Sequence, residues 1–415
     1  MSKPHAPLKP LDDALAELLQ RAVPLTGTET LTTWDADRRV LARAAISALQ
    51  VPPNDNSAMD GYAVRVADVP APGTELPVSL RVAAGDSARE PLPPGTAARI
   101  FTGAPIPPGA DAVLMQENCE ALQGAVRFND VPKPGQAIRR AGEDIAKNSE
   151  VLAAGTRLGP AELGLAASIG MAELDVSRRP RVALFSTGDE LVMPGTVDPQ
   201  DMPPGAIYNS NRYFLRVMLQ RLGCEVHDMG IVPDQLDATI AALREAASSS
   251  DLIVTSGGVS VGEEDHLRPA VQALGQLALW QIAIKPGKPF AYGSIDGVAG
   301  APATHFIGLP GNPVSSFITF ALLVRPFVLR LQGMHNVAPQ ALQARADFHW
   351  PKPQGRREFL RVRHNAEGGL DLFANQGSGV LTSAAWGDGV VDHPAGSTIT
   401  KGQNVRFLPF SELLT

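Results

Sequence analysis

A glycine- and acid-rich stretch at residues 255–266 holds the side chains whose chemistry is easiest to interpret. The apolar residues 252–254 predict a strand that leads directly into it. Gly257 and Gly258 permit a turn with positive φ, which brings backbone N–H groups close to an anion or a phosphate. Acids gathered at a strand end favour a bound cation, because two carboxylates ~4 Å apart repel by roughly 4 kcal/mol at a dielectric near 20. Three acids follow the glycines here: Glu263, Glu264 and Asp265. Taken alone, the loop is explained more simply as a glycine-rich turn before a solvated, acid-rich helix start.

Further acids follow two other predicted strands of the same region. Asp189 and Glu190 come after the apolar run 182–185, and Asp234 follows the next run. A sheet that gathers its strand ends at one edge could place acids around one Mg²⁺, which takes oxygen ligands and keeps several waters. The ligands expected from this pattern are Glu190, Asp234 and Asp265. Helix N-capping is the alternative role for such acids, and we prefer it for Asp189.

Two more loops carry groups suited to an anion. Lys285 and Lys288 flank a Pro-Gly turn that directs two ammonium groups to one side, although a solvated turn explains the pattern equally well. Residues 308–313, GLPGNP, precede a helix whose first N–H groups could hold an anion, or they form only a tight turn. The chain has no GxxxxGK[ST] sequence and no strand-linked GxGxxG sequence, which excludes the ordinary P-loop and dinucleotide sites. We expect replacement of either lysine to leave stability almost unchanged.

Strands and helices alternate over residues 181–332 and must position these groups. This alternation predicts an α/β domain with a mostly parallel sheet and helices on both faces. Ligands of such sheets bind at the carboxyl ends of the strands. Because each polar loop follows a predicted strand, all of them should meet at that one edge.

The regions that flank residues 181–332 have a different pattern of apolar residues. Residues 11–21 predict an amphipathic helix, and a second helix is expected at 35–45. Short β-type runs separated by Pro and Gly fill residues 50–147 and 347–410, which predicts an inserted β-rich domain and a C-terminal β barrel or sandwich. Residues 161–170 are helical again, so the opening helices and this one are expected to form one discontinuous domain.

Composition narrows the class of protein. The chain has 415 residues, too many for one core, and 44% of them are hydrophobic. A formal charge of −7 argues against nucleic-acid binding, and no segment has the length or apolarity of a signal peptide or a membrane span. Cys119 and Cys224 lack metal-site spacing, so a reducing, cytoplasmic location is expected.

Taken together and in order, seven segments of the sequence closely resemble the molybdopterin molybdenumtransferases of the MoeA type, which include the C-terminal part of gephyrin. The resemblance spans residues 11–410. The segments that carry it are NSAMDGYAV (56–64), FTGAPIPPGAD (101–111), AGEDI (141–145), FSTGDEL (185–191), TSGGVSVGEEDH (255–266), KPGKPF (285–290) and GLPGNPVSSF (308–317).

The resemblance implies a fold and a reaction. It implies an elongated, four-domain homodimer with the active site near the dimer interface. The divisions expected are 1–48 with 148–180, 49–147, 181–332 for the molybdopterin-binding domain, and 333–415 for a C-terminal β barrel. The family joins molybdate to the dithiolene of adenylylated molybdopterin with a divalent metal, Mg²⁺, and releases AMP and molybdenum cofactor. An upstream adenylyltransferase and downstream molybdoenzyme chaperones are the protein partners implied.

The resemblance also assigns residues to the site. The catalytic positions it implies are Asp60, Thr102, Asp144, Glu190, Asp234, Asp265, Lys285 and Lys288. The substrate-binding positions are Ser57, Ser256, Gly257, Gly258, Ser260, Gly308, Pro310, Gly311, Asn312, Arg356 and Ser378. Arg357 duplicates the arginine beside it, so either of the two could face the ligand.

Two alternatives remain open on the sequence. A scaffold protein that keeps the pterin site without turnover is one, but the presence of Asp234, Asp265 and both lysines favours the enzyme. A nucleotide pyrophosphatase or amidohydrolase on the same α/β fold is the other, and it would lack the segments around Asp60 and Thr102.

Overall fold

The chain folds into two compact units, described here from a computed structural model that covers residues 8–87, 90–259, 266–297 and 302–414. The first unit consists of Met1–Glu29, Arg38–Ala42 and Val176–Thr415, and the second of Thr30–Asp37 and Arg43–Asp175. The chain leaves the first unit within β1 (Thr28–Thr32), rejoins it briefly at Arg38–Ala42, and returns to it finally within β12 (Glu173–Ser177). The finer division into four domains stays a prediction.

A six-stranded sheet organises the first unit, in the order β16-β13-β17-β21-β20-β18. The first four strands run parallel, as the alternation of strands and helices predicts, whereas β20 and β18 add an antiparallel edge that it did not predict. The sheet is therefore mixed, with a parallel centre. Its strands are β13 (Arg181–Thr187), β16 (Glu225–Val232), β17 (Leu252–Ser256), β18 (Gly275–Gln281), β20 (Pro289–Ile295) and β21 (Thr304–Leu309).

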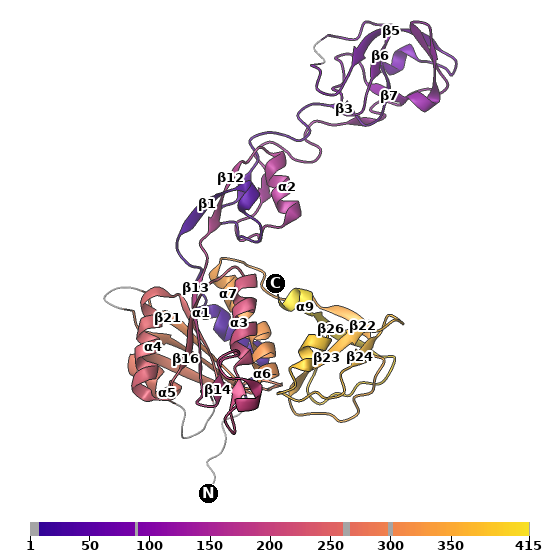
Figure 1. The fold of residues 1–415 in the computed structure, drawn as a ribbon. Helices are drawn as coiled ribbons and strands as arrows, with labels where there is room; N and C mark the ends of the chain where they lie inside the picture. Colours follow the sequence, from indigo (N-terminus) through magenta and orange to yellow (C-terminus); the bar gives the residue numbers. More distant parts are fainter. Residues whose placement is uncertain (1–7, 88–89, 260–265, 298–301, 415) are drawn as a thin grey trace. The chain divides into compact units, whose positions relative to one another are not determined.

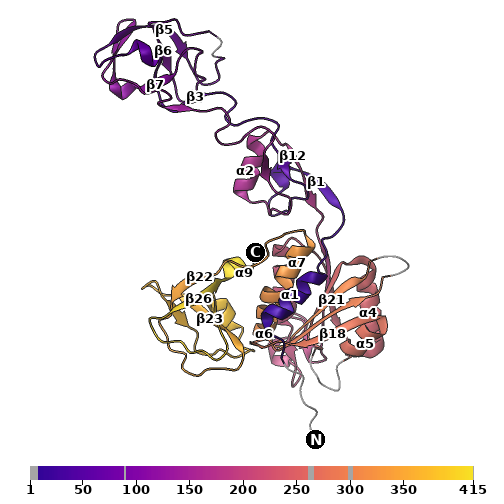
Figure 2. The same ribbon diagram turned by 180° about the vertical axis from the view of Figure 1, so that it is seen from behind.

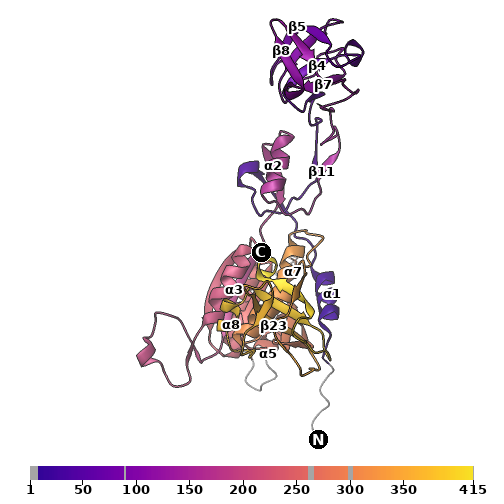
Figure 3. The same cartoon turned by 90° about the vertical axis from the view of Figure 1, so that its right-hand side faces the viewer.

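Helices cover both faces of this sheet, with α4 and α5 on one face and α1, α3, α6 and α7 on the other (Figure 1). Figure 3 shows α3, α7 and α1 next to one another. Alternate residues of β13 enter different cores: Val182 and Leu184 pack with the α1, α3 and α7 side, Ala183 and Phe185 with the α4 and α5 side. The helices are α1 (Leu11–Arg21), α3 (Ser210–Arg221), α4 (Leu236–Ser249), α5 (Leu267–Leu274), α6 (Pro313–Thr319) and α7 (Arg325–Leu331).

Helices α6 and α7 are continuous through a π-helical turn, η5 (Phe320–Val324). Pro326 lies in the first turn of α7 and cannot donate a backbone hydrogen bond, and a wider turn before it accommodates that loss. Among the described residues, Pro313–Leu331 is the one helical stretch long and apolar enough to cross a membrane, but 94% of its apolar 18-residue window is buried within the protein. It is thus a core helix of the α/β domain.

The C-terminal part of the first unit is the predicted β barrel, and its strands appear together in Figure 2. Strand pairing runs β19-β23-β25-β26-β22, with β24 also paired to β23. The bridge between Ala346 and Leu370 joins the end of β22 to β24, which closes the ring. The elements are β19 (Ile284–Lys285), β22 (Leu342–Arg345), β23 (Arg357–His364), β24 (Leu370–Leu372), α8 (Thr382–Trp386), β25 (Gly389–His393), β26 (Asn404–Pro409) and α9 (Phe410–Leu413).

The second unit contains the inserted β-rich region, a six-stranded sheet in the order β7-β4-β6-β5-β9-β8 (Figure 2). The helix expected at 35–45 is wrong: a short 3₁₀ turn, η1 (Thr33–Asp35), ends there, and Arg38 has a φ of 60°, which an α-helix does not allow. The other elements are β2 (Ala45–Ile46), β3 (Asn56–Ser57), β4 (Gly61–Val64), η2 (Val66–Asp68), β5 (Glu75–Val82), β6 (Ala97–Ile100), β7 (Ala112–Met115), η3 (Gln116–Asn118), β8 (Cys119–Leu122), β9 (Ala125–Phe128), β10 (Ile138–Arg139), β11 (Glu150–Leu152) and α2 (Pro160–Ser168).

Candidate active site

Three parallel strands of the first unit end side by side at one edge of the sheet. Ser256 at the end of β17 is in register with Ser186 of β13 on one side and with Leu309 of β21 on the other. The N–H of Gly257 then donates to the carbonyl of Leu309 at 3.1 Å, which ties two of the following loops together. The loops that the sequence singled out therefore converge where ligands of α/β sheets bind.

A cavity of about 500 Å³ lies at this edge. Two short parallel strands, β14 (Leu191–Val192) and β15 (Ile207–Tyr208), form part of its rim, and the N–H of Ile207 donates to the carbonyl of Glu190 at 2.8 Å. Eight of the predicted site residues line the cavity: Glu190, Asp234, Ser256, Gly257, Gly258, Pro310, Gly311 and Asn312. The structure thus brings together side chains from four separate loops.

The glycines of the cavity wall are needed for their backbone. Gly257 has a φ of 94°, and a Cβ there would lie 2.7 Å from the carbonyl oxygen of Thr187. Gly258 has a φ of 65° and equally little room. Gly308 differs, because it lies inside β21, does not line the cavity, and a Cβ on it would meet Val259 at 2.3 Å. Its role in the structure is close packing behind the site.

Two asparagines in this wall were not among the predicted site residues. Asn211, which is 7% exposed, donates from Nδ2 to Ser256 Oγ at 2.8 Å and to the carbonyl of Gly311 at 2.7 Å. It thereby joins the loops after β17 and β21. Asn209 caps α3 by accepting from the N–H of Arg212. The sequence did offer a signal for Asn211: it is a polar residue on the side of the helix that packs against the core, where an apolar residue is usual.

The KPGKP turn borders the cavity through Pro289, which lines it. Within the turn, Lys285 forms an ion pair with Glu358 of β23, with 3.0 Å between Nζ and Oε1. Among the described residues, Lys288 has no carboxylate within ion-pair distance. Arg356 donates from Nη1 to the carbonyl of Ile284 at 3.1 Å. The barrel therefore contributes one acidic and one basic side chain to the segment that carries the predicted lysines.

Ser378, the second predicted residue of the barrel, lies beside the start of α6. Its carbonyl accepts from the N–H of Val314 at 2.9 Å, and the flanking residues Pro313 and Ser315 line the cavity. Neither Ser378 nor the three basic residues Lys285, Lys288 and Arg356 themselves line the cavity as described. They occupy its border.

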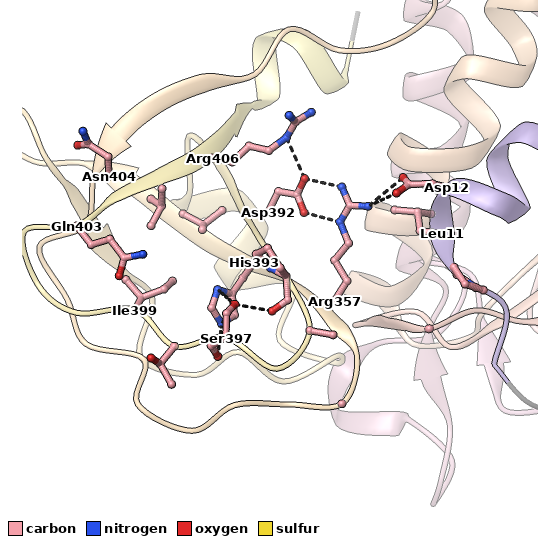
Figure 4. A pocket seen from close by; sticks show the side chains of 18 residues that line it. Leu11, Asp12, Arg357, Asp392, His393, Ser397, Ile399, Gln403, Asn404 and Arg406 are labelled. Carbon is pink, nitrogen blue, oxygen red and sulfur yellow. Dashed lines mark hydrogen bonds and ion pairs between the residues drawn. The ribbon is translucent and has the colours of Figure 1, made fainter.

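Arg357, the neighbour of Arg356, lies outside this site. It lies in a separate cavity of about 870 Å³ between the barrel and α1, shown in Figure 4. There it donates to both carboxylate oxygens of Asp392 at 2.6 Å and to Asp12, and the hydrogen bonds to Asp392 raise the pKa of Arg357 above its usual range. Arg406 completes the cluster at 3.0 Å from Asp392. The charged side chains of this larger cavity pair with one another. We therefore take the smaller cavity at the strand ends as the candidate active site.

The remaining predicted residues belong to the second unit. The N–H and the hydroxyl of Thr102 both donate to Asp60 Oδ1, at 2.7 and 2.8 Å, and these bonds hold the pKa of Asp60 below its usual range. Ser57 is fully buried and donates to the carbonyl of Met59, so its hydroxyl shapes the turn. Asp144 is exposed on a turn. Asp60 and Thr102 thus form one pre-organised acidic group.

The donor chemistry around the cavity fits an oxygen-preferring divalent metal in part. Glu190 and Asp234 line the same space, and the N–H of Asp234 contacts Asp189 Oδ1 at 3.4 Å. Within the described ranges, no group of three or more His, Cys, Asp or Glu side chains could hold a metal ion. The third predicted ligand, Asp265, and the predicted substrate contact Ser260 lie outside the described residues.

The chain is similar to proteins of one family along almost its whole length. Residues 9–170 match the "MoeA N-terminal region (domain I and II)", residues 183–330 the "Probable molybdopterin binding domain", and residues 343–410 the "MoeA C-terminal region (domain IV)". The cavity lies within the second of these segments.

Individual relatives agree with this assignment. The molybdopterin molybdenumtransferase of Haemophilus influenzae is 40% identical over 97% of this chain and 99% of its own length, and that of Nostoc is 35% identical over 98% and 94%. A crystal structure of the molybdopterin biosynthesis MoeA protein of Pyrococcus horikoshii superimposes with a TM-score of 0.84 at 28% identity, over 97% of this chain and 100% of that one. The chain therefore belongs to the MoeA-type molybdopterin molybdenumtransferase family.

Proposed function

We propose that this protein joins molybdate to the dithiolene of adenylylated molybdopterin and releases AMP and molybdenum cofactor, using the cavity at the strand ends as its active site. One observation carries the proposal: two carboxylates and three glycine-bearing loops meet in one cavity of the segment matched to the molybdopterin-binding domain. The KPGKP turn at its border adds positive charge where two anions, molybdate and a phosphate, must be held.

Different residues of the site suit the phosphate groups, the molybdate and the metal. The loop at Gly257 and Gly258 suits the phosphate groups, because a turn of positive-φ glycines exposes backbone N–H groups to an anion. Lys285 and Lys288 suit molybdate, and we assign Arg356, which donates to the carbonyl of Ile284 beside Lys285, to the same anion. Glu190 and Asp234, with Asp265 outside the described residues, would hold Mg²⁺. The metal would supply positive charge that neutralises phosphate oxygens when AMP leaves.

An assay of AMP release from adenylylated molybdopterin, with and without molybdate, tests this function. Wild-type protein should release AMP in a molybdate- and Mg²⁺-dependent manner. Asp234→Asn should lose most of that rate, whereas Asp237→Asn, an exposed acid three residues away in the first turn of α4, should keep it. Asp265→Asn should likewise lower metal-dependent turnover far more than stability. Release that ignores molybdate in the wild type would refute the proposal.

A homodimer in the cytoplasm is the state we propose for the enzyme. Asp60 and Thr102 support it, because these predicted site residues form a hydrogen-bonded pair in the second unit, while the cavity belongs to the first. Two free cysteines agree with a reducing compartment. A light-scattering mass equal to that of a single chain at working concentration would contradict the dimer.

A further inference from the structure

Glu358 is a carboxylate buried almost completely in the first unit, and no proposed catalytic step uses it. It is 1% exposed, and both of its oxygens are occupied. Oε1 lies 3.0 Å from the ammonium of Lys285, and Oε2 accepts from the indole N–H of Trp350 at 2.6 Å. A charge withdrawn from water to this extent is stable only with such partners, so the contact with Lys285 should persist when no ligand is bound.

The backbone places Glu358 opposite Lys285. Strand β19 pairs in parallel with β23, and Lys285 is in register with Glu358. The N–H of Arg357 donates to the carbonyl of Ala283 at 3.1 Å and extends the same ladder. The barrel strand thus fixes both the main chain and the side chain of the first lysine of the turn. The second lysine, Lys288, receives no such partner among the described residues.

Glu358 restricts the conformational freedom of the long Lys285 side chain. A lysine loses rotamer entropy when its ammonium is held in one place. For Lys285 this loss occurs on folding, because Glu358 already holds the ammonium. An ammonium has three N–H donors, so the ion pair with Glu358 leaves donors for an oxyanion. We propose that Glu358 is a positioning residue that presents the Lys285 ammonium to the anionic substrate. This inference rests on the function proposed above.

The variant Glu358→Gln tests it, because a glutamine can still accept from Trp350 and fills the same space. We expect kcat/KM for molybdate in the AMP-release assay to fall by about 10- to 100-fold, the size of effect that a displaced reacting group causes. Glu367→Gln, an exposed acid of the same barrel, is the matched control and should behave as the wild type. In a Lys285→Ala background, Glu358→Gln should cause no further loss, because the ammonium that it positions is already absent.

The outcomes separate the possibilities. Wild-type kcat/KM in Glu358→Gln, or losses that multiply in the double variant, would overturn the positioning role while leaving the proposed function intact. An activity loss that matches a loss of folded protein, measured by the thermal transition of the same sample, would make Glu358 only structural and would also overturn it. Absence of molybdate-dependent AMP release from the wild type would instead refute the proposed function, and the inference with it.

Discussion

Lys285→Ala should destabilise the protein, although the sequence gives no reason to expect this. The structure changes that expectation because the ammonium is the charged partner of a carboxylate that is only 1% exposed. Removing one partner of a fully buried pair costs about 3–5 kcal/mol. The Lys285 side chain is 37% exposed, so water and ions screen the pair and we reduce this estimate to roughly 1–2 kcal/mol.

Differential scanning calorimetry measures this effect. At about 2–4 °C per kcal/mol for a domain of this size, the transition of the first unit should fall by about 2–8 °C in Lys285→Ala. Lys288→Ala is the matched control, since the same turn loses the same side chain without exposing a buried acid, and its transition should move by less than about 2 °C.

A double variant identifies the cause. Adding Glu358→Gln to Lys285→Ala replaces the unpaired buried charge with a neutral amide, so the double variant should melt above Lys285→Ala alone. Equal midpoints for Lys285→Ala and Lys288→Ala would refute the reasoning, because the two lysines would then be equivalent, as the sequence implies. A double variant less stable than Lys285→Ala would show that Glu358 stabilises the fold without its lysine.

Three further perturbations should have distinct results. Burial alone would raise the pKa of Asp251, but the Arg178 guanidinium and the N–H and charge of Arg181 together hold that pKa below the usual 3.8. Asp251→Asn should therefore lower the thermal midpoint at pH 7, and the difference in midpoint between variant and wild type should narrow as the pH falls below 3.8. Calorimetry at pH 7 and at a pH below 3.8 checks this, and a difference in thermal midpoint that stays constant would contradict it. Gly257→Ala would force a Cβ to within 2.7 Å of Thr187 O at a φ of 94°, so substrate affinity should fall by at least 10-fold, about 1.4 kcal/mol, as measured by equilibrium titration, with Gly355→Ala as an uncrowded control. Asp60→Asn should lower the rate of AMP release and lower the thermal midpoint only slightly, because the half-buried side chain loses its charge but can still accept from Thr102. An unaltered rate would remove Asp60 from the site.

The parallel centre of the sheet and the edge where the site lies were predictable from local patterns. Apolar runs such as 182–185 are too short for helices and end in polar, glycine-rich loops, and parallel strands place such loops at one edge. Periodicity also gave α1 correctly over Leu11–Arg21. The expected helix at 35–45 failed because its apolar residues are buried in irregular backbone around Arg38, which periodicity alone does not distinguish from a helix.

Contacts between distant segments were not predictable. The ion pair between Lys285 and Glu358 joins residues that are far apart in the sequence. The parallel register of β19 with β23 brings them together. The difference between Arg356 and Arg357 likewise depends on distant partners, because Arg356 donates to the carbonyl of Ile284 and Arg357 to Asp392. A sequence pattern identifies the charged side chains, but it does not show which of them form ion pairs with one another.

Strand β23 shows why such charges remain in the barrel core. Besides Glu358 it buries Arg361, which is 1% exposed and whose pKa burial lowers to about 10, so it remains protonated near pH 7. Arg361 donates to Ser383 Oγ and to the carbonyl of Gly377, which holds the loop that carries Ser378. An apolar residue would be less costly at either position if the barrel served only stability. Both buried charges instead fix segments beside the cavity, so the barrel acts as a rigid support for the lysine turn on one side and the Ser378 loop on the other.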